Sequence, residues 1–149
     1  MSRDSDAGAV ETMTPDRAFN STAPFFAVAT VGEFWRLMNS NDFSAVSAIL
    51  TDDFILEWPQ SRELIRGPER FAQMNREFPA KGRWVFTVNH IVGNSSEAVS
   101  DVSVTDGFRH DRAVSFFTLR DQKICRIVEY WPEPFAAPSN RSHLVERMS

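Results

Sequence analysis

Cysteine, histidine and long apolar runs are scarce in this chain of 149 residues. The single cysteine, Cys125, cannot form an internal disulfide or a cysteine cluster for a metal, which favours a reducing, cytoplasmic setting. No stretch approaches the ~18 consecutive apolar residues of a membrane-spanning helix. The first residues include Asp4, Asp6 and Glu11 and no apolar run, so they do not predict a signal peptide.

Basic residues are also few, since 16 Lys and Arg stand against 20 Asp and Glu, and they are scattered along the chain. Nucleic acids and anionic membrane surfaces are bound by basic patches, so neither is expected as a partner. The histidines His90, His110 and His143 are dispersed without metal-binding spacing, and no metal site is predicted. A Gly-rich phosphate loop and a nucleophile elbow are absent as well.

Aromatic residues, by contrast, are abundant: the chain has 13 Phe and four Trp, and 42% of its residues are hydrophobic. This composition and length predict one domain with a substantial core or an apolar pocket. Residues 1–23 are polar and small and predict a flexible tail. The domain itself is expected over residues 24–134. A C-terminal extension over residues 135–149 follows, in which 140–148 can form a short helix.

The hydrophobic pattern is helical first and then has the period of strands. Val31, Phe34, Trp35 and Met38 follow helical spacing within residues 24–39. A short second helix ends near Leu50, and a third begins at Pro68 with Phe71, Met74 and Phe78 expected inside. Strands are predicted over residues 54–58, 83–92, 97–105, 109–120 and 123–131, and a loop over 60–66. On the strand 83–92, His90 shares a face with Trp84 and Phe86 and is expected to be buried.

Helices followed by consecutive antiparallel strands predict an α+β fold, with the helices on one face of a curved sheet. On the last strand, Glu129 and Trp131 lie on one face together with Ile127, because side chains alternate. A carboxyl group among aromatic rings has a raised pKa, which suits a general acid or base near neutral pH. The alternative is a structural acid paired with an arginine, for which Arg112 on the neighbouring strand is the expected partner.

Other candidate residues have weaker signals. Asp101 lies on a strand of which either face can be the cavity side, so it is either a second pocket acid or a solvated residue. Arg62 follows Trp58-Pro59 in a polar loop and either contacts substrate or is solvated. Four aromatic residues either fill the core or form the walls of a binding site: Trp35, Trp58, Phe116 and Trp131.

Several short motifs occur in a characteristic order between residues 24 and 134. They are Phe34-Trp35 on the first helix, Asp42-Phe43 leading to Leu50-Thr51-Asp52-Asp53-Phe54, Gly67-Pro68-Glu69, Ser115-Phe116-Phe117 with Arg120-Asp121-Gln122-Lys123-Ile124, and Glu129-Tyr130-Trp131. In this order the chain resembles the nuclear transport factor 2-like (NTF2-like) superfamily, and within it the SnoaL-like, polyketide cyclase-like group.

That resemblance implies a cone-shaped α+β barrel, in which a curved antiparallel sheet and three N-terminal helices enclose an apolar cavity. It also implies no obligatory cofactor and a homodimer through the sheet. Glu129 and Trp131 would point into the cavity. The superfamily includes isomerases, epoxide hydrolases, dehydratases, polyketide cyclases and non-enzymatic adaptors, so the fold alone does not assign an activity. Its ketosteroid isomerases have an Asp base just before the proline, where this chain has Trp58.

Two hypotheses of function follow from these residues and this resemblance. The first is a small-molecule enzyme of cyclase, isomerase or hydrolase type, which uses cofactor-free acid/base chemistry on an apolar, polycyclic or aromatic substrate. Its catalytic residues would be Glu129, Asp101 and Arg112. Its ligand-binding residues would be Trp35, Trp58, Arg62, Phe116, Ile127 and Trp131. The second hypothesis is a non-catalytic domain that binds a small ligand or serves as a protein adaptor.

Overall fold

The computed structural model describes residues 23–149, so the tail predicted over 1–23 lies, but for its last residue, outside the described residues. The elements follow in the order α2 (Phe26–Asn39), η1 (Phe43–Ile49), β1 (Leu50–Trp58), β2 (Glu63–Arg66), α3 (Pro68–Glu77), β3 (Val85–Gly93), β4 (Glu97–Thr105), β5 (His110–Arg120), β6 (Lys123–Tyr130) and η2 (Ser139–Arg141), where η is a 3-10 helix. No helix in this part of the chain is long and apolar enough to cross a membrane.

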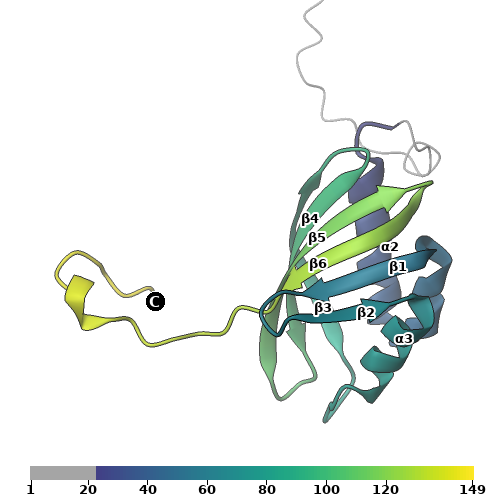
Figure 1. Cartoon of the computed structure of the whole chain (residues 1–149). Helices are drawn as coiled ribbons and strands as arrows, with labels where there is room; N and C mark the ends of the chain where they lie inside the picture. The colour runs from purple at the N-terminus through teal and green to yellow at the C-terminus, as the bar shows by residue number, and fades with distance from the viewer. Residues whose placement is uncertain (1–22) are drawn as a thin grey trace, which may run out of the picture.

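The strands form one mixed sheet in the order β2-β1-β6-β5-β4-β3. Figure 1 shows the sheet strongly curved, with α2 packed against β3, β4 and β5 and α3 against β1 and β2. The α+β cone predicted from the sequence is therefore confirmed. The expected purely antiparallel sheet is wrong for one pair of strands, because β6 runs parallel to β1. β3, β4, β5 and β6 form an antiparallel meander, and its last strand lies beside β1 and points in the same direction.

Helix α2 forms one wall of the core. Val31, Phe34, Trp35 and Met38 are all buried, as their helical spacing predicts. Each large apolar side chain that is removed from water contributes about 1.5–3 kcal/mol to stability. Phe34 also makes edge-on contacts with Trp35 and with Phe117 of β5, at centroid distances of 4.9 and 5.2 Å. The helix is thus held on the concave side of the sheet by aromatic packing.

Four local predictions are wrong for identifiable reasons. β1 begins at Leu50, and residues 63–66, expected as a loop, form an edge strand paired with β1. All of the β2 side chains except that of Ile65 are exposed, so no buried face marks this segment as a strand in the sequence. Phe78 follows the last residue of α3 and is 43% exposed. A bulge between Val88 and His90 shifts the register of β3, so His90 is exposed although Trp84 and Phe86 are buried.

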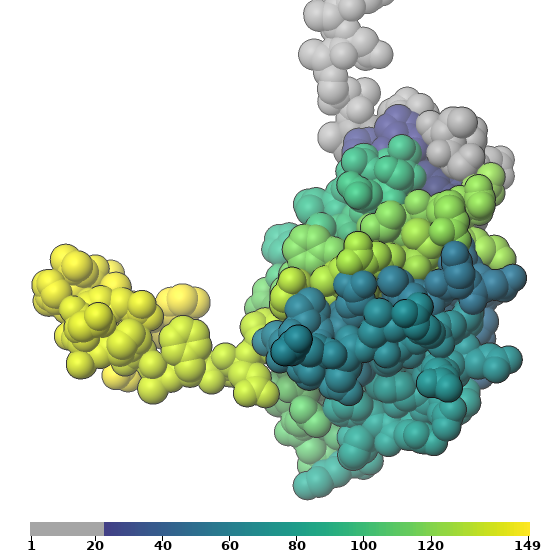
Figure 2. All heavy atoms as spheres, viewed as in Figure 1, coloured from purple at the N-terminus to yellow at the C-terminus, as the bar shows by residue number. Residues whose placement is uncertain are grey.

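After β6 the chain leaves the domain. The extension, residues 135–149, contains the single 3-10 turn η2 rather than a helix over 140–148. Figure 2 shows it projecting away from the body of the domain. Phe135, Leu144 and Met148 are more than three-quarters exposed, so these side chains add nothing to the core.

Candidate functional site

A cavity of about 680 Å³ lies between the sheet and the helices α2 and α3. Its walls are rich in aromatic residues, and all four Trp of the chain contribute to them. The aromatic lining residues are Phe34, Trp35, Trp58, Phe71, Phe78, Trp84, Phe86 and Trp131. Gln60 and Ser61 from the β1–β2 connection line it as well, together with Glu63 at the start of β2. The size and apolar lining are those of a small-molecule site.

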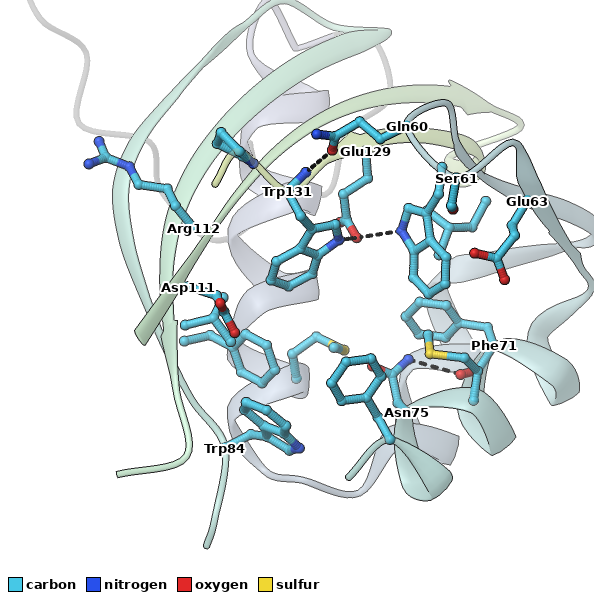
Figure 3. A pocket seen from close by; sticks show the side chains of 18 of the residues that line it. Gln60, Ser61, Glu63, Phe71, Asn75, Trp84, Asp111, Arg112, Glu129 and Trp131 are labelled. Atoms are coloured by element: carbon cyan, nitrogen blue, oxygen red, sulfur yellow. Dashed lines mark hydrogen bonds between the residues drawn. The ribbon is translucent and has the colours of Figure 1, made fainter. Parts of the chain in front are cut away.

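Glu129 lies in the wall of this cavity with only 6% of its surface exposed. Its Oε1 accepts hydrogen bonds from the indole Nε1 atoms of Trp58 and Trp131, at 3.0 and 2.9 Å (Figure 3). Its Oε2 accepts a hydrogen bond of 2.7 Å from the Ser115 hydroxyl. The carboxyl group therefore has three neutral donors.

The strand register explains how these donors meet. Ser115 on β5 is the direct cross-strand partner of Glu129 on β6. On the other side of β6, the parallel pairing of Glu57 with Val128 brings Trp58 beside Glu129. Trp131 follows two residues after Glu129 and shares its face. Its backbone N–H also donates to Gln60 Oε1 at 2.6 Å, which fixes the end of β6 to the β1–β2 connection.

Burial raises the pKa of Glu129, and the hydrogen bonds from Trp58, Ser115 and Trp131 counteract this only in part. Among residues 23–149, no Lys, Arg or His forms an ion pair with it. An indole N–H can only donate, so Oε1, with two such donors, is a poor place for a proton. The proton of the neutral form therefore belongs on Oε2, where the Ser115 hydroxyl can reverse and accept.

The expected partnership of Arg112 with Glu129 is wrong. Arg112 lies opposite Ser103, and its guanidinium binds both carboxylate oxygens of Asp101, at 2.6 and 2.5 Å. This pair is on the face of the sheet opposite to buried Ser100 and Val102, and it lowers the pKa of Asp101. Arg112 borders the cavity, but its side chain points away from it (Figure 3). Asp101 is therefore not a second pocket acid.

The predicted wall residues divide into two groups. Trp35, Trp58 and Trp131 line the cavity, and Trp35 Nε1 donates to Ser100 Oγ at 3.0 Å. Phe116 is 45% exposed on the outer face against Tyr130, so its prediction as a wall residue is wrong. Ile127 is fully buried in the core and, like the exposed Arg62, is not among the lining residues.

Sequence reasoning missed Arg109 and Asp111, which line the cavity. The Arg109 guanidinium is ion-paired with Asp111 at 2.6 Å and lies 5.6 Å from the ring centre of Phe78.

Asp106, outside the cavity lining, accepts hydrogen bonds from the backbone N–H groups of Lys81, Phe108 and Arg109, and these lower its pKa to about 2. The dipeptide Asp106-Gly107 predicts a turn. It does not predict that Asp106 binds Lys81 and so links the β4–β5 loop to the α3–β3 loop.

Ser115 and Trp84 were missed for another reason. Ser115 could be found only by aligning β5 with β6, because nothing in its own strand marks it as a partner of Glu129. Trp84 was assigned to a strand face without a role in the pocket.

Within the described residues, no group of three or more His, Cys, Asp or Glu is placed to hold a metal ion.

Comparisons with known proteins agree with this geometry. A family model described as a SnoaL-like domain matches residues 31–127. Among solved structures, a candidate ketosteroid isomerase from Kribbella flavida is 28% identical, with a TM-score of 0.79 over 87% of this chain and 95% of that one. An NTF2-like protein of unknown function from Burkholderia xenovorans is also 28% identical, with a TM-score of 0.66 over 80% and 93%.

A more distant structure shares the fold alone. It is an epoxide hydrolase of LEH-like type from M. tuberculosis, 20% identical, with a TM-score of 0.60 over 73% of this chain and 84% of that one. Among curated proteins, none matches this sequence. Because the family match spans most of the folded domain, from within α2 to Ile127 on β6, this chain belongs to the SnoaL-like family and has its NTF2-like fold.

Proposed function

We propose that the protein is a small-molecule enzyme that uses Glu129 for cofactor-free acid/base chemistry on an apolar, ring-containing substrate. The observation that carries this proposal is the position of Glu129: a buried carboxyl group, with a raised pKa and no cationic partner among the described residues, in the wall of a tryptophan-lined cavity. A carboxyl group in this environment can hold or release a proton closer to neutral pH than an exposed one.

Ser115 gives this carboxyl group a hydrogen-bond partner in both of its protonation states. A hydroxyl group both donates and accepts, so Ser115 Oγ can hold the ionised form of Glu129 and equally accept from Oε2 in the neutral form. Trp58 and Trp131 donate to Oε1 in both forms and stabilise the negative charge of the ionised form. In this arrangement Glu129 would exchange the proton with the substrate, Ser115 would keep its hydrogen bond to Oε2 in both protonation states, and the rings would orient the substrate.

The location of the acid also supports a reaction unlike that of a ketosteroid isomerase. The residue before Pro59, an Asp in those enzymes, is Trp58 here, and its indole points its N–H at Glu129. The acid thus comes from β6 rather than from β1. Cyclase, hydrolase and other isomerase chemistries remain compatible with a single carboxyl group and its hydroxyl partner.

A second candidate function, a non-catalytic ligand-binding domain, is favoured by one observation. The Glu129 carboxyl group accepts hydrogen bonds from two indole N–H groups and one hydroxyl, which is also expected of a structural acid that holds two indoles in place. The cavity would then bind a small apolar molecule without converting it. The experiment below separates the two functions.

We also propose that the protein is a cytoplasmic homodimer. The outer face of the sheet supports the dimer, because the rings of Phe116 and Tyr130 remain 45% and 39% exposed there. The same face supports the adaptor alternative, in which a different protein covers it. The single half-buried Cys125 supports a reducing compartment.

The test is a thermal-shift screen against polycyclic ketones, quinones, steroids, epoxides and fatty acids, followed by a turnover assay of each hit. A ligand at 100 times its dissociation constant adds about 2.7 kcal/mol of stability. Glu129→Gln keeps the size and the acceptor oxygen of the side chain. We expect it to bind the hit and to lose turnover by about 10²-fold or more, the usual contribution of a general acid or base.

The controls decide between the two functions. Glu97→Gln removes an exposed carboxylate outside the cavity lining and is expected to leave turnover unchanged. If a ligand binds wild type and Glu129→Gln alike and neither converts it, the cavity is a binding site. If both convert it at the same rate, Glu129 is not the acid or base. If nothing binds, the adaptor function is favoured instead.

A further inference from the structure

We infer that the cavity selects ligands in which a cationic nitrogen, an amine or a quaternary ammonium, is attached to an apolar ring. Two features of the cavity carry this inference: walls made from all four tryptophans, and a lining charge that is negative wherever it is not already paired. It rests on the proposed function in one respect only, namely that the cavity is a ligand site.

Three of the four tryptophans are held in place by their indole N–H groups. The indole N–H groups of Trp58 and Trp131 both end on Glu129 Oε1, and that of Trp35 ends on Ser100. Figure 3 shows Trp131 and Trp84 on opposite sides of the open space, with the Asp111 carboxylate beside them. Indole is the aromatic ring that attracts cations best, and rings whose N–H groups are already bonded offer their faces to a ligand.

The charges in the lining point the same way. Four carboxylates contribute to it: Glu63, Asp111, Glu129 and Glu133. The cationic lining residues in the described part of the chain are Arg109, ion-paired with Asp111, and Arg112, ion-paired with Asp101 outside the cavity. An anionic ligand would therefore be repelled by the carboxylates and would find no unpaired cation, whereas a cationic ligand would be attracted by the carboxylates.

Glu129 provides the strongest local reason for a cation. Its carboxylate is almost fully removed from water, and neutral donors replace only part of the lost hydration. A positive charge a few ångströms away interacts far more strongly in such a site than it would in water. A bound ammonium group therefore stabilises the ionised form of Glu129, and the ionised form in turn retains the ammonium group.

The protein already contains one cation bound in this manner. The Arg109 guanidinium lies over the ring of Phe78 and is ion-paired with Asp111, and all three residues are in the lining. The mouth of the cavity is thus built from an aromatic ring and a carboxylate around a cation. With about 680 Å³ of space, the interior can take an ammonium group together with a ring system.

The inference is tested by the intrinsic tryptophan fluorescence of the full-length protein, since all four indoles line the cavity. Benzyltrimethylammonium is titrated against neopentylbenzene, which has the same shape but a carbon in place of the charged nitrogen. We expect the cation to bind wild type at least about 10-fold more tightly than its neutral isostere. In Glu129→Gln, that preference should fall several-fold while the affinity for neopentylbenzene stays within about twofold.

Glu97→Gln makes the same carboxyl-to-amide change at an exposed position outside the lining, and should keep the full preference for the cation. Equal affinities for the two probes, or tighter binding of neopentylbenzene, would overturn the cation inference and leave the cavity as an apolar site. The cation inference would also be overturned if neither probe binds and a neutral polycyclic compound from the screen does bind. If neither the probes nor any compound of the screen binds, the proposed ligand site fails as well.

Discussion

Glu129 bears on both the stability of this fold and its proposed function. It is buried on the same face of β6 as the core residue Ile127, yet it is ionisable and has no counter-ion among the described residues. A buried, unpaired carboxylate destabilises a fold unless it takes up a proton or acquires a partner. We therefore expect the charge of this one group to appear in the dependence of stability on pH.

The pKa of Glu129 is raised above its ordinary value of 4.5 by burial. Between that value and the folded-state pKa, the native protein keeps a proton that the unfolded chain has lost, so this group lowers the free energy of unfolding as the pH rises through that window. Glu129→Gln imitates the protonated form and should remove this decline. Urea unfolding from pH 4.5 to 8.5 measures the effect. As the pH rises, the free energy of unfolding of the mutant should increase relative to that of wild type.

Glu97→Gln serves as the control for this prediction, because its carboxylate is exposed. Its unfolding free energy should run parallel to that of wild type over the same pH range. If Glu129→Gln also runs parallel to wild type, the carboxyl group is not destabilised by burial, and the electrostatic basis of the proposed acid/base role is lost.

The sequence predicts this residue better than its partners. Alternation along one strand is enough to put Glu129 and Trp131 on a common face, and both line the cavity. The hydrogen-bond partners depend on how strands align, and a single strand does not contain that information. A charged residue, Arg112, was the natural expectation for an acid, whereas the register places the small hydroxyl of Ser115 there instead.

At the scale of elements, two asparagines connect the end of α2 to the start of β3. The Asn39 side chain exchanges two hydrogen bonds of 2.8 Å with the backbone N–H and C=O of Phe86. Asn41, which has a φ of 58°, does the same with Trp84, at 2.9 and 2.8 Å. These amide groups act as a short substitute for a paired strand at the outer edge of β3. They also fix Trp84, one of the cavity walls.

We expect Asn41→Gly to lower the free energy of unfolding by about 2 kcal/mol, because the polar backbone groups of Trp84 lose their partners at a largely buried position. Glycine tolerates the positive φ, so the substitution tests the side chain rather than the backbone. Chemical denaturation measures the change. Asn89→Ala, whose amide bonds the Ser103 hydroxyl on an exposed face, should stay within about 0.5 kcal/mol of wild type. Similar values for both mutants would contradict this role of Asn41.

Elements with a strong hydrophobic period are predictable, and those shaped by their neighbours are not. Helix α2 follows from the spacing of Val31, Phe34, Trp35 and Met38. β2 has no such period, because it is a four-residue edge strand that exists through its bonds to β1. The bulge in β3 likewise depends on the partner strand β4 and reverses the expected face of His90.

At the scale of the whole molecule, curvature separates two apolar surfaces. The concave face of the sheet is covered by the helices and encloses the cavity, whereas no helix of residues 23–149 covers the outer face. There Phe116 pairs across strands with Val128, and Val114 with Tyr130, which forms a compact apolar cluster on β5 and β6. An exposed apolar cluster on a sheet is a frequent site of association.

We therefore expect light scattering at micromolar concentration to give twice the chain mass of 17.0 kDa. Phe116→Asp places a charge in the centre of the cluster without touching the core, because the side chain is already 45% exposed, and it should shift the protein toward monomer. Phe108→Asp makes the same change at a 68% exposed position in the β4–β5 turn, away from this cluster, and should leave the dimer intact. A wild-type monomer, or dissociation by both mutants alike, would contradict an interface at this face. Retained ligand binding by the monomeric mutant would show that one chain builds the complete cavity.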